Sequence, residues 1–258
     1  MHEIAIGCTI EGQHHSPAQL ARVQHARHLH VLHQMKRLGA RMVHDGTPLS
    51  HDDIDVLGAE DAHRVSTAVR QSFSVDDITD LYQEQIRASD HMWKQANNAP
   101  VGAPLRASIA DVTVTGITID EFRDHAAGPD VLERTYAQLN PDHYFCCQSD
   151  AGMHGMETFG MYGGPTEVYI TTDPTISAPI VVEPDYSLLT AGYTRLASDG
   201  TDVNILALHQ IKPLSDGFAV KLGAFFPPHT PNEVVDGHRV HMAIELWEMC
   251  KLLTHPLP

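Results

Sequence analysis

Four residues near the C-terminus carry side chains that are able to bind a metal ion. They follow one another at steps of three, four and three residues and are His238, His241, Glu245 and Glu248. These steps place them on one face of a helix, and a His and a Glu four residues apart can bind one metal ion. The same spacing is common on a solvated helix face, and the pair alone favours that plainer interpretation.

A second group of metal-binding side chains lies upstream and comprises His125, His143, His154 and Glu157. Metal sites often combine two neighbouring residues of a helix with ligands from distant segments. Two nitrogen and two oxygen ligands would come from His125, Glu157, His241 and Glu245. This set suits zinc, and it equally suits Fe2+ or Mn2+. His154 is the main alternative to His125, and on a strand residues 154 and 157 would face opposite sides, so only one of them should reach the site.

The composition narrows the classes of function. The 258 residues include 33 acidic and 17 basic side chains, for a formal net charge of −16. A surface this acidic repels phosphate backbones and anionic lipids, so we expect no nucleic-acid partner and no membrane partner. No apolar run reaches the roughly 20 residues of a membrane-spanning helix. The four cysteines form no CxxC pair, and the first residues do not resemble a signal peptide; both observations favour a cytoplasmic protein.

Residues 1–105 are predicted to form a helical region. Apolar residues recur at helical spacing after Ser16, Ser50 and Ser74, and serine is a residue type that caps helix N-termini. Pro and Gly residues interrupt this pattern over 97–104. We therefore place a boundary near residue 105 and expect the helical region to pack on the rest of the chain or to form the interface of a homodimer.

Residues 106–258 change to the alternating pattern of strands. Strands are predicted over 109–114, 167–172, 180–183, 187–196, 203–212 and 218–226. Asp-Gly pairs at 199–200 and 216–217 predict hairpins, and a long helix over 237–254 follows. The pattern predicts an α+β fold of the helix-grip (Bet v 1/START-like) type, in which an antiparallel sheet wraps a long C-terminal helix. A cavity for a small apolar ligand is expected between the two.

Several segments of this second part are similar to one known family. They are the residues from His241 to Leu253, the stretch 116–144 with His125 and His143, the residues from His154 to Glu157, and the stretch 206–217 with His209. Their order resembles that of 2,4-diacetylphloroglucinol hydrolase and its phloretin-hydrolase relatives. The resemblance covers roughly residues 106–258. The chain departs from the family in having only Phe122 as an aromatic residue just before His125, and in a shorter stretch between Glu157 and His241.

The resemblance implies a zinc-dependent hydrolase that cleaves the carbon–carbon bond between an acyl group and a phloroglucinol-like ring. The implied substrate is a small aromatic ketone, and the implied metal ligands are His125, Glu157, His241 and Glu245. Zinc would polarise the water that attacks the ketone, and the ring carbon would have to be protonated. His209 and His143 are the candidates for acid–base catalysis, and His143 is equally a candidate for holding a metal ligand in place.

Three other interpretations stay open. A non-catalytic helix-grip protein that binds a small apolar or aromatic ligand would leave the His and Glu residues solvated. A histidine-rich metal buffer, suggested by the 19 histidines, would have several weak sites. Zinc-assisted hydrolysis of an ester or amide would use the same residues on another substrate.

Overall fold

The structure, a computed structural model, describes residues 4–100, 102–126, 129–172 and 182–254. Its α-helices are α1 (Pro17–Arg37), α2 (His51–Asp55), α3 (Ala59–Gln71), α4 (Val75–Leu81), α5 (Gln83–Ala96), α6 (Ile119–Ala126), α7 (Pro129–Leu139) and α8 (Asn232–Thr254). A short 3-10 helix, η1, spans Phe159–Met161. None of the helices in these ranges has the length and apolar character that crossing a membrane requires.

The strands form one large antiparallel sheet and one small hairpin. In the order β2-β1-β5-β11-β10-β9-β8-β7-β6, the large sheet contains β1 (Ala5–Ile10), β2 (Gln13–His15), β5 (Arg106–Thr115), β6 (His143–Ser149), β7 (Gly152–Glu157), β8 (Thr166–Thr172), β9 (Ser187–Leu196), β10 (Asp202–Leu214) and β11 (Gly217–Phe226). The hairpin pairs β3 (Val43–His44) with β4 (Thr47–Pro48). The α+β class, the antiparallel sheet and the long C-terminal helix are therefore confirmed.

Both predicted Asp-Gly turns join neighbouring strands. Gly200 lies between β9 and β10 with a φ of 71°, in the left-handed region that glycine enters without steric cost. Gly217 begins β11 with a φ of 148°, and a Cβ at this position would overlap the backbone of Val114 on β5. The turn thus also allows β11 to pair closely with β5.

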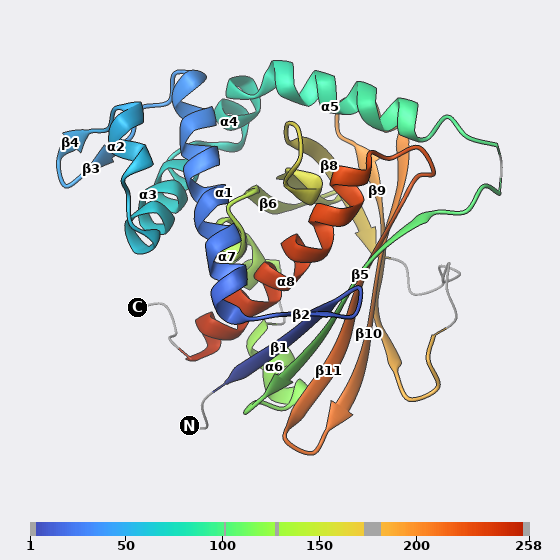
Figure 1. Ribbon diagram of the computed structural model, residues 1–258. Coiled ribbons are helices and arrows are strands. Elements are labelled where there is room, and N and C mark those ends of the chain that lie inside the picture. The colour runs from blue at the N-terminus through green and yellow to red at the C-terminus, as the bar shows by residue number, and fades with distance from the viewer. Residues whose placement is uncertain (1–3, 101, 127–128, 173–181, 255–258) are drawn as a thin grey trace.

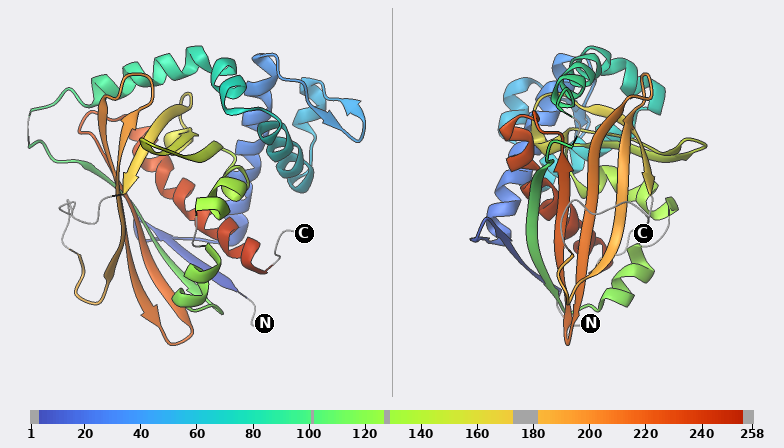
Figure 2. Two further views of the ribbon diagram at one scale, coloured as in Figure 1. Left: turned by 180° about the vertical axis from the view of Figure 1, so that it is seen from behind. Right: turned by 90° about the vertical axis from the view of Figure 1, so that its right-hand side faces the viewer.

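Helix α8 crosses one face of the sheet (Figure 1). Apolar residues of α8, among them Ala243 and Ile244, pack against residues of β5 and β11 such as Val112 and Val220 in the larger hydrophobic core. Among the described residues, the opposite face of the central strands carries no helix (Figure 2). The side of the sheet that α8 covers is consequently where a site between helix and sheet can form.

The N-terminal helices pack on the large sheet through two sets of contacts. Trp93 of α5 is fully buried, stacks on Phe226 of β11 and donates a hydrogen bond of 2.8 Å to the hydroxyl of Thr166 on β8. A second hydrophobic core joins α1, α3, α4 and α5 to Tyr144 and Met156 of β6 and β7. The boundary near residue 105 stays a prediction.

Several elements differ from the sequence-based expectation. The region 1–105 is not purely helical, because β1 and β2 belong to the large sheet and β1 pairs with β5. Helix α7 and strands β6 and β7 occupy a stretch for which no element was predicted, and α8 begins five residues before the predicted start at 237. Of the predicted strand 180–183, residues 182–183 are not in a strand and residues 180–181 lie outside the described ranges.

Candidate metal centre

Two adjoining cavities lie between α8 and the sheet. One, of about 130 Å³, is lined by Glu157, His209, His238, His241 and Glu245 together with apolar side chains. The other, of about 240 Å³, is largely apolar, with aromatic walls from Phe122 and Phe218. His209, Met242 and Glu245 line both, so a single ligand could extend from the polar cavity into the apolar one.

The imidazole of His143 meets that of His241, which lines the polar cavity. Both side chains are about 1% exposed, and their Nε2 atoms lie 2.9 Å apart. Nδ1 of His143 lies 3.1 Å from the backbone carbonyl oxygen of Tyr136. Because a carbonyl oxygen only accepts hydrogen bonds, Nδ1 of His143 carries the proton and its Nε2 presents a lone pair. The hydrogen bond to the Tyr136 carbonyl therefore leaves the lone pair of His143 on Nε2, where it can accept a proton or bind a metal ion.

The surroundings of His241 fit a metal ligand. Because His143 Nε2 presents a lone pair, the contact between the two rings makes His241 Nε2 the hydrogen-bond donor. His241 Nδ1 is buried and has no hydrogen-bond partner among the described residues. Two nitrogen ligands at about 2.0–2.1 Å from a tetrahedral zinc stand about 3.3 Å apart. The 2.9 Å between the two Nε2 atoms is close to that separation, so both could bind one ion once the proton between them has left.

Two carboxyl groups, those of the buried Glu157 and the half-buried Glu245, adjoin the histidine pair. Glu157 Oε2 accepts a hydrogen bond of 2.5 Å from the hydroxyl of Tyr136 and lies 3.6 Å from His143 Nε2. Burial raises the pKa of Glu157 to about 7, and the charge of Asp142 adds to the increase. Burial raises the pKa of Glu245 to about 8, with a contribution from the charge of Glu157. A cation bound here would stabilise both carboxylates.

Ligand atoms of these residues form two compact groups. Within each group they all lie within 4.8 Å of one another, and the groups are His143 with His241 and Glu245, and Glu157 with His238 and His241. His241 belongs to both. The described structure thus brings together five of the residues that the sequence singled out: His143, Glu157, His238, His241 and Glu245.

His238 joins this cluster through an unusually close approach of two glycines. Gly160 of η1 has a φ of 65°, and a Cβ on Gly160 would overlap the backbone of Val234, just as one on Gly237 would overlap the backbone of Gly160. This contact lets the Gly160 N–H donate a hydrogen bond of 3.2 Å to His238 Nδ1. Neutral His238 consequently carries its proton on Nε2, so in this orientation it offers a hydrogen-bond donor instead of a lone pair.

His209 has the same tautomer for the same reason. It lies on β10, and its Nδ1 accepts a hydrogen bond of 3.2 Å from the N–H of Gly223 on β11. Burial lowers the pKa of His209 to about 4, so at neutral pH the imidazole is uncharged with its proton on Nε2. His209 therefore presents a neutral N–H donor to the two cavities that it lines.

The loop before β6 holds His143 against α8. Buried Arg70 of α3 donates hydrogen bonds to the backbone carbonyls of Asn140 and His143. The Asn140 amide donates to the carbonyl of His241 at 3.1 Å, and Arg27 of α1 pairs with both oxygens of fully buried Asp142. The N-terminal helices thus position the segment that carries His143.

His125 and His154 are the two remaining candidates for the first metal ligand. His125 lies in α6, but its side chain falls outside the described residues. His154 lies on β7, with Nε2 2.7 Å from Glu167 Oε1 on β8, and its ring stacks on Tyr169. It is absent from both groups of ligand atoms among the described residues, so it has a partner of its own outside the cluster.

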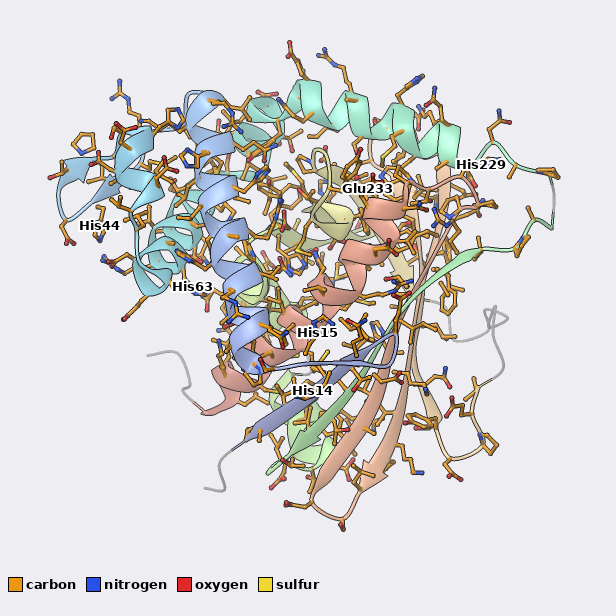
Figure 3. All side chains as sticks on the ribbon, in the orientation of Figure 1. His14, His15, His44, His63, His229 and Glu233 are labelled. Atoms are coloured by element: carbon orange, nitrogen blue, oxygen red, sulfur yellow. The ribbon has the colours of Figure 1, made fainter. Side chains whose placement is uncertain are left out.

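The sequence assigned no role to Tyr136, His238 or the glycine pair. The three-residue step from His238 to His241 placed both on one helix face, which was the only available signal for His238. The contribution of Tyr136 depends on its backbone carbonyl and on a contact across the fold, neither of which leaves a pattern in the sequence. Other histidines lie outside this cluster: Figure 3 shows His14 and His15 on β2, His44 on β3, His63 on α3 and His229 before α8.

Comparison with known proteins adds no family assignment. No protein-family model matches this chain, and a search of curated proteins returns no match. The resemblance to the acylphloroglucinol hydrolases therefore stays a prediction.

Proposed function

We propose that this chain is a zinc-dependent hydrolase that cleaves the carbon–carbon bond between an acyl group and a phenolic ring. The observation that carries the proposal is the pair of ligand groups that share His241, one with His143 and Glu245 and the other with Glu157 and His238. His241, Glu157 and Glu245 line the polar cavity, and Glu245 also lines the apolar one. Fe2+ or Mn2+ would suit the same ligand atoms. We also propose that the sheet and α8 form a helix-grip arrangement, supported by the packing of α8 on β5 and β11.

Two imidazole and two carboxylate ligands, from His143, Glu157, His241 and Glu245, would hold the ion, and His125 is a further candidate from α6. The short distance between the two Nε2 atoms supports this fit. When bound, zinc supplies a positive charge that activates water at neutral pH and stabilises negative charge on oxygen.

The cavity walls then determine how a substrate is oriented. The aromatic ring of an acylphenol would lie in the apolar cavity between Phe122 and Phe218, with its acyl group directed toward Glu245 and His241. The apolar walls exclude water from the ring, and this strengthens every polar contact made to the substrate there.

His209 and His238 supply the hydrogen-bond donors of the site. Each is neutral with its proton on Nε2, because a backbone N–H occupies Nδ1. Each Nε2–H would donate to a substrate oxygen that gains negative charge as the carbon–carbon bond breaks. A neutral imidazole stabilises such an oxygen without adding a buried positive charge. Because the pKa of His209 is low, this role suits His209 better than the role of a cationic acid.

Elemental analysis of tag-free protein and of the Glu245→Ala variant tests the metal site. We expect about one zinc per chain bound at this site and lost in the variant, whereas His154→Ala, a histidine substitution outside the cluster, should retain it. Metal-loaded protein should convert acylated polyphenols to a carboxylic acid and the free phenol, as measured by chromatography. Binding of an aromatic ketone with neither metal nor cleavage would overturn the proposal in favour of a plain ligand-binding protein.

A further inference from the structure

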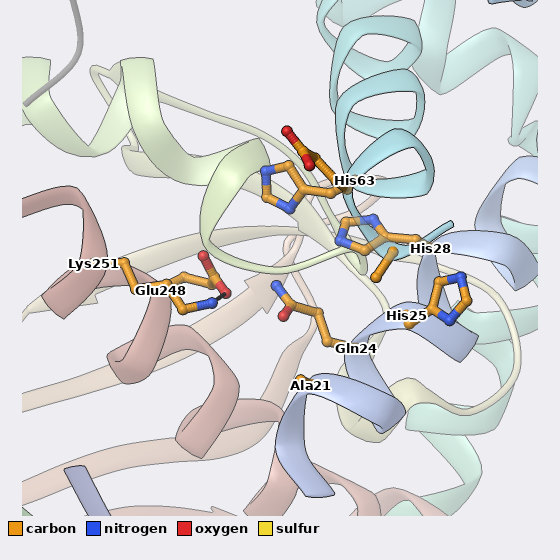
Figure 4. A pocket seen from close by; sticks show the side chains of 9 residues that line it. Ala21, Gln24, His25, His28, His63, Glu248 and Lys251 are labelled. Carbon is orange, nitrogen blue, oxygen red and sulfur yellow. Dashed lines mark hydrogen bonds and ion pairs between the residues drawn. The ribbon is translucent and has the colours of Figure 1, made fainter. Parts of the chain in front are cut away.

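A separate polar cavity of about 230 Å³ lies between α1, α3 and α8. Its walls include Gln24 and His28 from α1, His63 from α3, and Glu248 and Lys251 from α8. Figure 4 shows Glu248 and Lys251 facing Gln24 and the two imidazoles across the cavity. Three elements that are distant in the sequence thus direct polar side chains into one space.

His28 is the unexplained residue of this cavity. Its side chain is 1% exposed, and neither Nδ1 nor Nε2 has a hydrogen-bond partner among the described residues. The neighbouring Gln24 is 6% exposed and its Nε2 is likewise unpartnered. Each buried polar group left without a partner costs about 1–3 kcal/mol, so an ion bound to the lone-pair nitrogen of His28 would recover part of this free energy.

His63 and Glu248 complete a set of metal-binding side chains around His28. The rings of His28 and His63 meet edge to face with centroids 4.9 Å apart. Glu248 is 7% exposed, and its Oε1 accepts a hydrogen bond of 2.5 Å from Lys251 Nζ. That Lys251 ammonium lies 3.9 Å above the ring of Trp247.

Both imidazoles are neutral at pH 7. Burial lowers the pKa of His28 to about 2, and burial also lowers the pKa of His63. Metal ions bind the neutral form of imidazole, so neither histidine has to lose a proton before it binds one. Two neutral imidazoles and a buried carboxylate are ligand types that zinc and its first-row neighbours favour.

We propose that His28, His63 and Glu248 form a second site for a divalent transition-metal ion, with Gln24 as an additional ligand or hydrogen-bond partner. Their ligand atoms do not all lie within 4.8 Å of one another, unlike those of the two groups that contain His241. Binding therefore draws the partly exposed His63 ring and the Glu248 carboxylate toward His28. The ion replaces Lys251 as the partner of Glu248 and links α1 and α3 to α8.

The second site uses a different cavity from the first. Glu248 follows Glu245, the nearest residue of the first site, by three residues, which is about 4.5 Å along a helix axis, but it lines the cavity between α1, α3 and α8, which Glu245 does not. None of His28, His63 and Glu248 lines the cavities beside the first site. The two sites can therefore be removed one at a time.

Zinc titration of a His241→Ala/Glu245→Ala variant, in which the first site is disabled, tests the proposal. We expect this variant to bind one zinc per chain and to show a higher thermal midpoint with zinc than with chelator. Adding His63→Ala should weaken zinc binding at least tenfold and remove the thermal shift. The matched control is His25→Ala, because His25 lines the same cavity while its Nε2 is bonded to the Leu57 carbonyl; it should leave binding unchanged.

Glu248→Gln provides a second test that does not depend on a histidine, and circular dichroism of the zinc-free variants checks their folding. The proposal is overturned if the double variant binds no zinc at micromolar concentration, or if His63→Ala and Glu248→Gln bind as tightly as their parent. A wild-type protein that holds one zinc, lost on His63→Ala and retained on His241→Ala, would instead refute the proposed function and leave the second site standing.

Discussion

The Nε2 atoms of His143 and His241 face each other at 2.9 Å although 98 positions separate the two residues in the chain. One imidazole comes from the first residue of β6 and the other from α8. Both are buried, and the proton of His143 is fixed on Nδ1 by the Tyr136 carbonyl. The fold itself thus holds in place the two Nε2 atoms that would bind the metal ion.

His143→Ala should weaken zinc binding by more than about 100-fold. Removing only a residue that supports a metal ligand typically costs 10–100-fold, and His143 contributes a ligand atom. Competition with a chromogenic chelator measures the affinity. His154→Ala is the matched control, because its partner is Glu167 outside the cluster; equal affinities for the two variants would contradict the assignment of His143.

Metal-free protein should lose stability as the pH rises from 6.5 to 8. The pKa of Glu157 is raised to about 7 and that of Glu245 to about 8, above their value in the unfolded chain. Their contribution is fully present below about pH 4.3 and is lost as the pH rises through these values. The buried histidines act oppositely, but only below about pH 6.5, where unfolded imidazole takes up protons.

Denaturant unfolding with chelator present measures this effect. Between pH 6.5 and 8 Glu245 alone should account for about 2 kcal/mol, at 1.36 kcal/mol per pH unit. Glu245→Gln should flatten the curve, and zinc should abolish the loss because it stabilises the ionised carboxylates. A chelated protein whose stability increases over this range would refute the assignment of these two groups.

His209→Ala should reduce kcat toward an acylphenol by about 100-fold while the zinc content stays unchanged. The loss of one preorganised donor to a developing oxyanion typically costs that much, and His209 is not in either group of ligand atoms. Steady-state kinetics with elemental analysis separates the two effects. Zinc lost together with activity would mean that His209 supports the metal site instead.

Gly160→Ala should destabilise the protein by about 3 kcal/mol. The alanine would have to adopt a φ of 65° and would also overlap the Val234 backbone, which adds overpacking to backbone strain. Gly163→Ala is the matched control: its φ is 74° with no atom within 4 Å of the added Cβ, so it should cost about 1 kcal/mol from strain alone. Similar losses in the two variants, measured by denaturant unfolding, would show that η1 does not pack tightly on α8.

The sequence reveals the parts of the fold that depend on local patterns. The helix with His241 and Glu245 and the turns at Gly200 and Gly217 all have signals within a few residues, and they were predicted correctly. β1 was missed because its six residues include Gly7 and its partner β5 lies about a hundred residues away. Pairing over such a distance leaves no periodicity in the chain.

In the candidate site, too, some residues have a local sequence signal and others do not. His241 and Glu245 were recognised from their spacing, whereas the arrangement of His143 depends on the Tyr136 carbonyl and on Arg70 across the fold. The orientation of His238 depends on the contact between Gly160 and Gly237. Such contacts determine which nitrogen carries a proton, and residue types and spacing do not encode that choice locally.

The contact between Lys251 and Trp247 makes Trp247 a fluorescence probe of the second cavity. Of the two tryptophans in the chain, Trp93 is sealed in the core, whereas Trp247 has the Lys251 ammonium 3.9 Å above its ring. A nearby positive charge shifts the emission of an indole, and any ion that takes over Glu248 releases the ammonium from its present position. Fluorescence of Trp247 in a Trp93→Phe background would therefore follow occupancy at the α8 end of the second cavity in real time.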